Sequence, residues 1–330
     1  MQKKIGILGA GTWGAALAAI LAGAGHEVTV YSALAEEVAF LKKERRHPKL
    51  SCFTIPQSIR FTESIEEACE DKALLLFAVP SPFVRATAMA ARPFVKKGQL
   101  IADVAKGIEE GSLLFLSEVI KEVLGEVSVV ALTGPTHAEE VAADMPSTIV
   151  AASSDAAAAE AVQEIFTGTC LRVYTHPDIR GAELSGALKN VIALATGIAE
   201  GIGYGDNAKA ALITRGMAEI TRLGLAMGCD SRTFAGLAGI GDLIVTATSP
   251  HSRNGKAGRL IGMGHTVDDA VREVGMVVEG LNALPAAMAL AEKYGVELPI
   301  THAVHAVVKE GVSPRACVEM LMSRTRKNEF

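Results

Sequence analysis

The segment GILGAGTWG near the N-terminus constrains the fold more than any other feature of this sequence. It carries Gly9, Gly11 and Gly14, follows the short apolar run KIGIL, and opens an alanine-rich stretch with helical character. At such a strand-to-helix turn, the first glycine permits a tight turn, the second lets backbone approach a pyrophosphate, and the third lets helix and strand pack closely. The first N–H groups of the helix are then available to phosphates. The segment therefore predicts a dinucleotide site; the alternative is a glycine-rich packing turn.

Strand-length apolar runs alternate with helical stretches through the first half of the chain. Because most of these runs are apolar on both faces, they are typical of strands in a covered, mostly parallel sheet. Helices expected at residues 12–24, 82–91 and 112–124 complete β-α-β units between them. The predicted strands are residues 4–8, 27–31, 73–79, 99–104, 127–132, 147–153 and 171–175.

Beyond about residue 180 the strand pattern nearly vanishes and helical segments follow one another. A chain of 330 residues is long for one core, so two domains are expected. We predict an α/β fold with a Rossmann-like dinucleotide-binding domain over residues 1–185 and an all-helical substrate domain over residues 186–330. The predicted helices of the second half are residues 181–200, 207–227, 231–238, 256–262, 267–273, 280–294, 299–309 and 314–323.

Composition and charge exclude several classes of partner. The formal net charge is −5 and the isoelectric point is about 6.0, so we expect neither nucleic acid nor an anionic membrane as a partner. The N-terminus has a short basic start like a signal peptide, but three glycines interrupt its apolar stretch, and no later run reaches the roughly 18 apolar residues of a membrane helix. The cysteines are odd in number and widely scattered, which argues against a framework of disulfide bonds. This pattern favours a reducing cytoplasm. They are Cys52, Cys69, Cys170, Cys229 and Cys317.

The sequence leaves the choice between NAD and NADP open. An acidic residue after the second strand is typical of NAD binding, and an arginine there is typical of NADP binding. The second predicted strand is followed by Ser32 and Ala33, and Ser32 is compatible with either cofactor. Basic residues downstream are more typical of a solvated helix face than of a phosphate site. They are Lys42, Lys43, Arg45 and Arg46.

Polar residues also follow two later predicted strands. Lys106 comes just after the strand predicted to end at residue 104, and Gly134 and Thr136 come just after the strand predicted to end at residue 132. In open α/β sheets, ligands bind outside the carboxyl ends of the strands. We therefore expect both turns to meet the same ligand.

Lys189 is the only charged residue in the stretch SGALKNVIALATG. A buried lysine without a partner is costly, so one interpretation is that its stem lies along apolar surface while its ammonium group reaches water. The other is a functional amine whose pKa is lowered by desolvation and by a second ammonium group, and raised again by a carboxylate. The composition of the stretch does not decide between them.

A second polar cluster lies in AGIGDLIVTATSPHSRN. Asp242 follows a glycine turn, and Ser252, Arg253 and Asn254 are consecutive. An arginine beside small donors suits a phosphate group, because the guanidinium gives a forked, charge-assisted contact. A polar surface turn is an equally good interpretation on local grounds.

Together these segments resemble bacterial NAD(P)-dependent glycerol-3-phosphate dehydrogenase. The resemblance runs in the same order over nearly the whole chain. It implies a fold like that of 6-phosphogluconate dehydrogenase, reduction of dihydroxyacetone phosphate to sn-glycerol 3-phosphate with NAD or NADP as cofactor, a supply of backbone for glycerophospholipids, and a homodimer. The matching segments are GAGTWG, AVPS, KGIE, GPTHAEEV, ELSGALKNVIALATGIAEG, AGIGDLIVTATSPHSRN, VVEG and ELPI.

The resemblance also implies roles for individual residues. Lys189 matches the proton donor and acceptor, and we expect Lys106 and Asp242 to act with it. The dinucleotide is expected to contact Gly9, Gly11, Thr12, Trp13, Gly14, Ser32, Lys106, Ala138, Arg253, Val277 and Glu279. The triose phosphate is expected to contact Lys106, Gly134, Thr136, Lys189, Asp242, Ser252, Arg253 and Asn254.

Two segments depart from the family pattern. Ser32 and Ala33 replace the basic residue often found after the second strand, which puts phosphate-based selectivity for NADP in doubt. The loop at residues 47–56 lacks the usual Tyr-Leu-Pro, so no adenine contact is expected from it.

Two alternatives stay open at this point. The first is a related two-domain dehydrogenase of the 3-hydroxy acid or ketopantoate type, which would recognise a carboxylate rather than a phosphate. The second is a dinucleotide sensor without activity, although Lys106, Lys189 and Asp242 argue against this. A metal site at His302 and His305 is not expected, because no acidic or third histidine partner is evident in the sequence.

Overall fold

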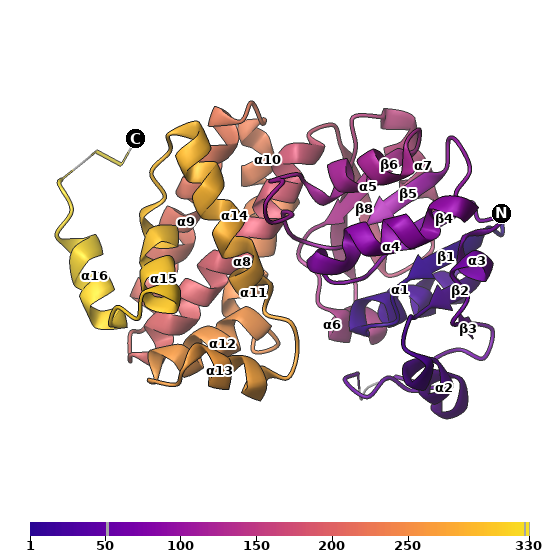
Figure 1. Ribbon diagram of the computed structural model, residues 1–330, viewed down its shortest axis with the longest axis horizontal. Coiled ribbons are helices and arrows are strands. Elements are labelled where there is room, and N and C mark those ends of the chain that lie inside the picture. Colours follow the sequence, from indigo (N-terminus) through magenta and orange to yellow (C-terminus); the bar gives the residue numbers. More distant parts are fainter. Residues whose placement is uncertain (51–52, 327, 330) are drawn as a thin grey trace. The chain divides into compact units, whose positions relative to one another are not determined.

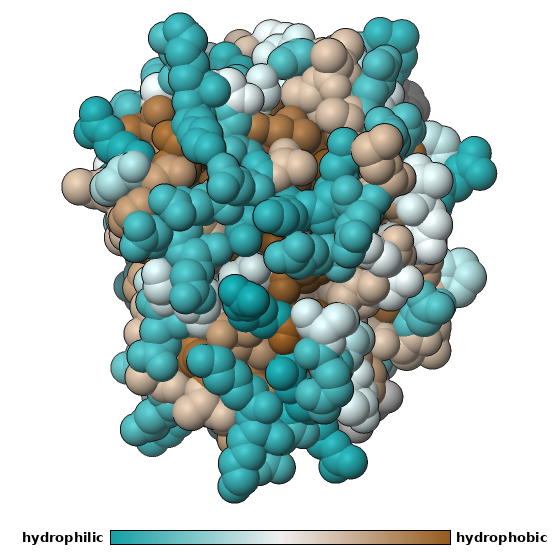
Figure 2. Space-filling model, turned by 90° about the vertical axis from the view of Figure 1, so that its right-hand side faces the viewer, coloured by the Kyte–Doolittle hydropathy of each residue, from teal (hydrophilic) through white to brown (hydrophobic). Residues whose placement is uncertain are grey.

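A computed structural model describes residues 1–50, 53–326 and 328–329 (Figure 1). The chain divides into two compact units, Met1–Glu183 and Leu184–Phe330, and helix α8 (Ile179–Gly201) contains the point of division. In these ranges no helix is both long enough and apolar enough to cross a membrane. Figure 2 shows a face on which hydrophilic side chains predominate and hydrophobic ones are scattered among them.

The first unit contains an eight-stranded sheet in the order β3-β2-β1-β4-β5-β6-β7-β8. Neighbouring strands are parallel except β6 and β7, which confirms the mostly parallel sheet predicted from the apolar runs. The strand β3 was not predicted, because it has only three residues. The strands are β1 (Lys4–Leu8), β2 (Glu27–Tyr31), β3 (Arg60–Thr62), β4 (Leu74–Phe77), β5 (Leu100–Asp103), β6 (Ser128–Thr133), β7 (Ser147–Ala152) and β8 (Leu171–His176).

Helices cover both faces of this sheet. Alternation along β1 sends Ile5 and Ile7 into one apolar core and Leu8 into another. The first core is closed by α1 (Thr12–Gly23), α2 (Ala35–Glu44) and α7 (Ala156–Ile165), and α6 (Ala138–Ala142) packs beside α1. The second core is closed by α3 (Ile65–Cys69), α4 (Val84–Ala91) and α5 (Leu116–Leu124).

One helix of the first unit begins later than predicted. We expected a helix over residues 112–124, but α5 begins at Leu116. The preceding residues cannot be helical, since Gly111 and Leu113 have φ values of +87° and +58°, and Ile108 forms a bridge with Phe115. The segment that contains Lys106 therefore ends in a turn, and α5 begins after this turn.

The second unit is entirely helical in the described ranges, as predicted. The prediction missed α11 (Asp242–Thr248), because glycines and a Ser-Pro pair on either side hide its short helical pattern. A turn at Leu237–Gly241 leads into it. The remaining helices are α9 (Asp206–Ala226), α10 (Ser231–Ala235), α12 (Arg253–Gly262), α13 (Val267–Val274), α14 (Glu279–Tyr294), α15 (Pro299–Lys309) and α16 (Pro314–Met322).

Small residues bring α8 and α12 into close backbone contact. A methyl group on Gly258 would overlap the carbonyl oxygen of Leu194, and one on Gly197 would overlap that of Gly255. Because glycines on both helices, Gly197 on α8 and Gly258 on α12, lie along this contact, the two backbones approach closely. The N-terminal turn of α12 is thereby fixed beside the middle of α8, which carries Lys189.

Candidate active site

The glycine loop of the first unit has the geometry that its three glycines predict. Gly9 has a φ of +124°, and its N–H group donates a hydrogen bond to Tyr31 O at 2.9 Å. A methyl group on Gly14 would overlap the carbonyl oxygen of Gly9, so the third glycine allows α1 to pack against the loop. Gly11, at the N-cap of α1, is exposed, and no atom lies within 4 Å of the position where a Cβ would stand. The backbone there is open to a pyrophosphate, as the motif requires.

The other predicted cofactor residues are distributed over both units. Thr12 and Trp13 open α1, and Trp13 packs against the first core. Ala138 is the first residue of α6. Val277 is half-buried before α14 in the second unit, and Glu279 opens that helix, where its Oε2 accepts a bond from Asn282 Nδ2 at 3.3 Å.

The basic residues after β2 are mostly solvated. Lys42, Lys43 and Arg46 are exposed, and Lys43 Nζ lies 3.4 Å from Glu44 Oε1. Arg45 is different, because its Nη1 donates to Ile59 O at 2.8 Å and its guanidinium lies 5.6 Å from the ring centre of Phe61. The interpretation as a solvated helix face therefore holds for three of the four residues.

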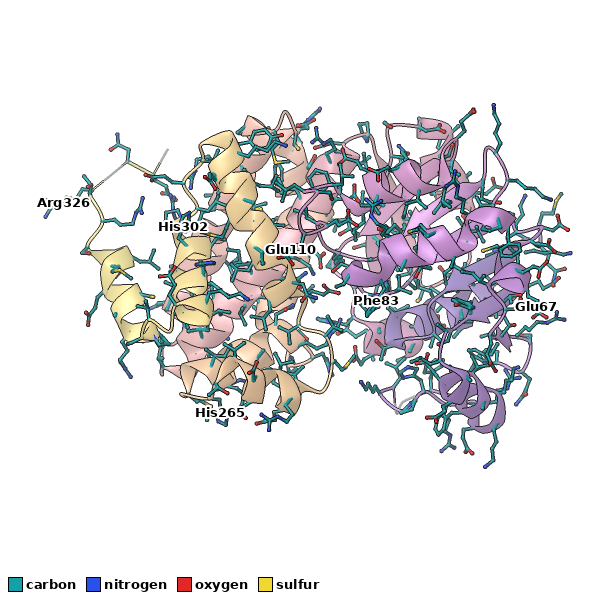
Figure 3. All side chains as sticks on the ribbon, in the orientation of Figure 1. Glu67, Phe83, Glu110, His265, His302 and Arg326 are labelled. Atoms are coloured by element: carbon teal, nitrogen blue, oxygen red, sulfur yellow. The ribbon has the colours of Figure 1, made fainter. Side chains whose placement is uncertain are left out.

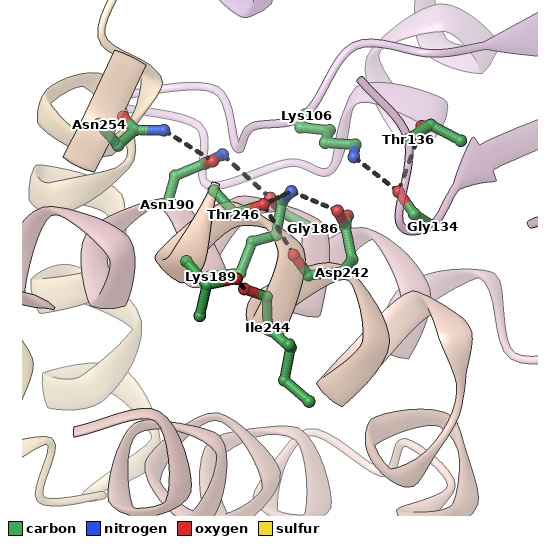
Figure 4. A network of polar contacts seen from close by, with 11 residues as sticks. Lys106, Gly134, Thr136, Gly186, Lys189, Asn190, Asp242, Ile244, Thr246 and Asn254 are labelled. Carbon is green, nitrogen blue, oxygen red and sulfur yellow. Dashed lines mark hydrogen bonds and ion pairs between the residues drawn. The ribbon is translucent and has the colours of Figure 1, made fainter. Parts of the chain in front are cut away.

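Two turns at the carboxyl ends of neighbouring strands meet in the first unit (Figure 4). Lys106 follows β5, and its Nζ donates to Gly134 O at 3.4 Å. Thr136 Oγ1 donates to the same oxygen at 3.3 Å. Since β5 and β6 are adjacent in the sheet, the two turns lie side by side, and the expectation that they meet the same ligand stays a prediction.

A buried carboxyl group shapes the turn that carries Lys106. Asp103 ends β5, and its Oδ1 accepts the N–H of Ala105 at 3.0 Å. Burial raises the pKa of Asp103 well above its ordinary value; the bond from Ala105 opposes this shift and the nearby Glu183 adds to it. Burial therefore favours the neutral form of this carboxyl group. Sequence reasoning missed Asp103, because an aspartate at a strand end is more often exposed.

Lys189 is held by two side chains of α11 in the second unit (Figure 4). Its Nζ lies 2.5 Å from Asp242 Oδ1 and 2.5 Å from Thr246 Oγ1. The side chain of Lys189 is 5% exposed and that of Asp242 is fully buried. The ammonium group therefore does not reach bulk water, which excludes snorkelling. A buried charge of this kind is tolerated because it is paired and hydrogen-bonded.

Thr246 is a candidate site residue that sequence reasoning missed. Its hydroxyl accepts from Lys189 and donates to the main-chain oxygen of Asp242 at 2.7 Å. Asp242 and Thr246 are four residues apart, so they share one face of a helix. This spacing would have revealed the pair if residues 242–248 had been predicted as helical.

The Ser-Arg-Asn segment lies at the N-terminus of α12, and its three side chains differ in setting. Ser252 is the N-cap, and its Oγ accepts the N–H of Gly255 at 3.1 Å. Arg253 is exposed in the first turn. Asn254 is buried, and its Oδ1 accepts the N–H of Gly280 at 2.8 Å. Of the three, Arg253 alone presents its polar group to solvent.

Asn254 is part of a chain of amide hydrogen bonds with a second residue that the sequence analysis missed. Its Nδ2 donates to Asn190 Oδ1 at 2.9 Å, and Asn190 Nδ2 donates to Gly186 O at 3.1 Å (Figure 4). These bonds join α8, α12 and the start of α14 at the residue next to Lys189. Their signal in the sequence is the adjacency of Lys189 and Asn190 in a segment of otherwise small or apolar residues.

Among the residues that the structure describes, the two histidines of α15 belong to no candidate metal cluster. Figure 3 labels His302, and His305 Nδ1 lies 3.1 Å from Glu310 Oε1, an acidic partner that the sequence analysis did not anticipate. Across the described ranges, no group of three or more histidine, cysteine, aspartate or glutamate side chains has the arrangement that a metal ion needs.

The fold and these side chains together define a class of protein. A glycine loop on a parallel sheet, followed by a helical unit with a buried and hydrogen-bonded ammonium group, defines a two-unit dinucleotide-dependent oxidoreductase. Family models of the N-terminus and the C-terminus of NAD-dependent glycerol-3-phosphate dehydrogenase match residues 4–159 and 178–319. The chain belongs to the NAD-dependent glycerol-3-phosphate dehydrogenase family.

Individual relatives match over nearly their full length. The chain is 58% identical to glycerol-3-phosphate dehydrogenase NAD(P)+ 2 of Lactobacillus delbrueckii subsp. bulgaricus, covering 100% of this chain and 99% of the relative. It is 47% identical to the NAD(P)+ enzyme of Bacillus subtilis, covering 100% and 96%. The crystal structure of glycerol-3-phosphate dehydrogenase from Coxiella burnetii superposes with a TM-score of 0.94 at 35% identity, covering 98% and 99%.

Proposed function

We propose that this chain reduces dihydroxyacetone phosphate to sn-glycerol 3-phosphate, reversibly, with NAD or NADP as the cofactor. The observation that carries the proposal is the buried ammonium group of Lys189, paired with Asp242 and bonded to Thr246. Family membership supports the substrate, and the open glycine loop supports the cofactor. The first unit would bind the dinucleotide and the second would supply the proton donor.

The proposed mechanism assigns Lys189 to proton transfer. When bound, the reduced cofactor supplies a hydride to the C2 carbonyl carbon of the substrate. Lys189 donates a proton from Nζ to the carbonyl oxygen as negative charge develops there, and accepts it again in the reverse direction. Asp242 and Thr246 fix the position of Nζ, so little reorganisation is needed when the proton moves.

The remaining polar groups would position the substrate. Lys106 would polarise the carbonyl oxygen, and its bond to Gly134 O holds it at the strand end. Arg253 would bind the phosphate through its guanidinium group. Ser252 and Asn254 would act mainly by fixing the first turn of α12, because their side chains are engaged within the unit.

The substrate assignment is tested by steady-state rates of NADH and NADPH oxidation. We expect turnover with dihydroxyacetone phosphate, and a value of kcat/KM at least about 10³-fold lower with ketopantoate or a 3-oxo acid, which lack the phosphate that Arg253 would bind. Replacing Arg253 with alanine should raise the Michaelis constant for dihydroxyacetone phosphate. Equal use of a 3-oxo acid would overturn the assignment in favour of a related dehydrogenase, and no turnover with any of these substrates would favour a dinucleotide sensor.

The biological setting follows from the same proposal. The product would supply the backbone of glycerophospholipids in the cytoplasm, and the chain would act as a homodimer. The described cysteines form no disulfide bond with one another, and Cys52 lies outside the described residues. Light scattering of the purified chain measures the oligomeric state directly, and a monomer at micromolar concentration would contradict the dimer.

A further inference from the structure

An acidic side chain of α2, that of Glu37, lies at the end of β2, where the strand itself carries no acidic residue. Ser32 follows the strand and is buried. Its Oγ donates a hydrogen bond to Glu37 Oε2 at 2.6 Å and accepts the N–H of Leu34 at 3.2 Å. These two bonds fold the first turn of α2 back toward the strand end. The half-buried carboxylate of Glu37 therefore lies at the place where dinucleotide-binding sheets present the residue that contacts the adenosine ribose.

The glycine loop and Glu37 border the same region. Gly9 N–H is bonded to Tyr31 O, so the loop after β1 and the end of β2 are directly joined. The buried His47 connects them a second time. Burial lowers the pKa of His47; the charge of Glu37 raises it, Lys49 lowers it, and a bond to the backbone of Ala10 raises it. His47 therefore contacts the glycine loop at Ala10 and lies close enough to Glu37 for that charge to raise the pKa of His47.

Two of the basic side chains in this region, His47 and Arg45, form hydrogen bonds with the main chain of other residues. His47 is neutral at physiological pH, because its pKa is lowered and its Nδ1 accepts the N–H of Lys49 at 3.1 Å. The guanidinium of Arg45 donates to the carbonyl oxygen of Ile59. Lys49 is exposed, and its charge, like that of Glu37, acts on the pKa of His47. Among the described residues, the hydrogen bond shown for the carboxylate of Glu37 comes from Ser32 and not from an arginine of the kind that NADP-binding sheets use.

We propose that Glu37 binds the 2′-hydroxyl of the adenosine ribose and makes this chain selective for NAD over NADP. Oε2 is held by Ser32, and Oε1 accepts a hydrogen bond from the ribose. A 2′-phosphate at the same place would bring two like charges together, which disfavours binding of NADP. This inference rests on the proposed function only in that the dinucleotide is the hydride donor.

The test compares kcat/KM for NADH and NADPH at saturating dihydroxyacetone phosphate in the full-length protein and its variants. We expect the unmodified chain to prefer NADH by on the order of 10²-fold. Glu37→Gln keeps the size of the side chain and removes its charge, so it should reduce this preference by about tenfold or more. The matched control is Glu36→Gln, which removes an exposed charge one residue earlier in the same helix turn and should change the preference by less than about twofold.

Two outcomes would overturn the inference. One is an unmodified chain that uses NADPH as well as or better than NADH; loss of that use in Lys49→Ala would then assign the 2′-phosphate to Lys49. The other is an unchanged cofactor preference in a folded Glu37→Gln variant. Equilibrium binding of NADH and NADPH, followed by cofactor fluorescence, measures the same preference without a substrate. Selective NADH binding without turnover of dihydroxyacetone phosphate would therefore refute the proposed substrate and leave the inference standing.

Discussion

Lys189 shows how a charge is placed in a buried setting at the scale of single residues. Its ammonium group has three protons to donate, and Asp242 and Thr246 accept two of these bonds. The carboxylate balances the charge, while the hydroxyl adds a neutral acceptor whose direction is fixed by its own bond to Asp242 O. The arrangement therefore specifies the position of Nζ as well as its charge.

Thr246→Val tests whether this positioning affects catalysis. Valine keeps the shape of the side chain but removes the acceptor for Nζ, and a lost bond of this kind costs about 1–3 kcal/mol. We expect kcat to fall by about tenfold with a nearly unchanged Michaelis constant for the cofactor.

Thr248→Val is the matched control for that variant. Thr248 lies on the same helix, and its hydroxyl also donates to the carbonyl oxygen four residues earlier, Ile244 O at 2.8 Å, but the side chain is exposed. Its replacement should leave kcat within about twofold. Equal losses in the two variants would show that Thr246 acts only through the stability of α11.

At the scale of elements, two helices have apolar N-cap residues and are capped by buried glutamates from other helices. Glu219 of α9 accepts the N–H groups of Ile300 and Thr301 at the start of α15 at 2.7 and 3.3 Å. Glu183 of α8 accepts the N–H and the hydroxyl of Ser117 at the start of α5 at 2.9 and 2.5 Å. These carboxylates satisfy N–H groups that a local cap would otherwise serve.

Glu219→Gln should change how the stability of the protein depends on pH. Burial, opposed by its hydrogen bonds, raises the pKa of Glu219 from its ordinary value of 4.5 to about 7. Between these values the folded chain keeps a proton that the unfolded chain has lost, so its free energy of unfolding falls as pH rises. Glutamine does not titrate. The stability of the unmodified chain relative to the variant should therefore fall from about pH 4.5 to about pH 7 and then level off.

Urea denaturation across this pH range measures that difference. The control is Glu319→Gln on α16, an exposed carboxylate whose replacement should give a nearly constant difference from the unmodified chain. A difference for Glu219→Gln that rises with pH, or one that does not change, would contradict the proposed protonation of this cap.

At the scale of the whole molecule, the sequence predicts regular patterns better than short elements and remote contacts. The glycine loop and seven of the strands follow from local spacing, so they were predicted correctly. The short β3 and α11 carry too few residues to show a period, and the error at α11 also hid Thr246. Glu37 was missed for a different reason: it lies five residues beyond Ser32, and only the folded turn joins the two side chains.

The division into two units also organises the proposed chemistry. The first unit contributes the glycine loop, Glu37 and Lys106, whose positions depend on the carboxyl ends of β1, β2 and β5. The second contributes Lys189, which depends on the pairing of α8 with α11. A variant in Lys189 should therefore leave cofactor binding by the first unit intact.

The most direct test of the central claim is the turnover number of Lys189→Ala with dihydroxyacetone phosphate, measured beside its equilibrium affinity for NADH. The exposed Lys309→Ala of α15 is the control for loss of a positive charge. We predict that Lys189→Ala binds NADH as the unmodified chain does but turns over at least about 10²-fold more slowly, whereas Lys309→Ala keeps full activity. A Lys189→Ala protein with near-normal turnover would contradict the assignment of this ammonium group as the proton donor.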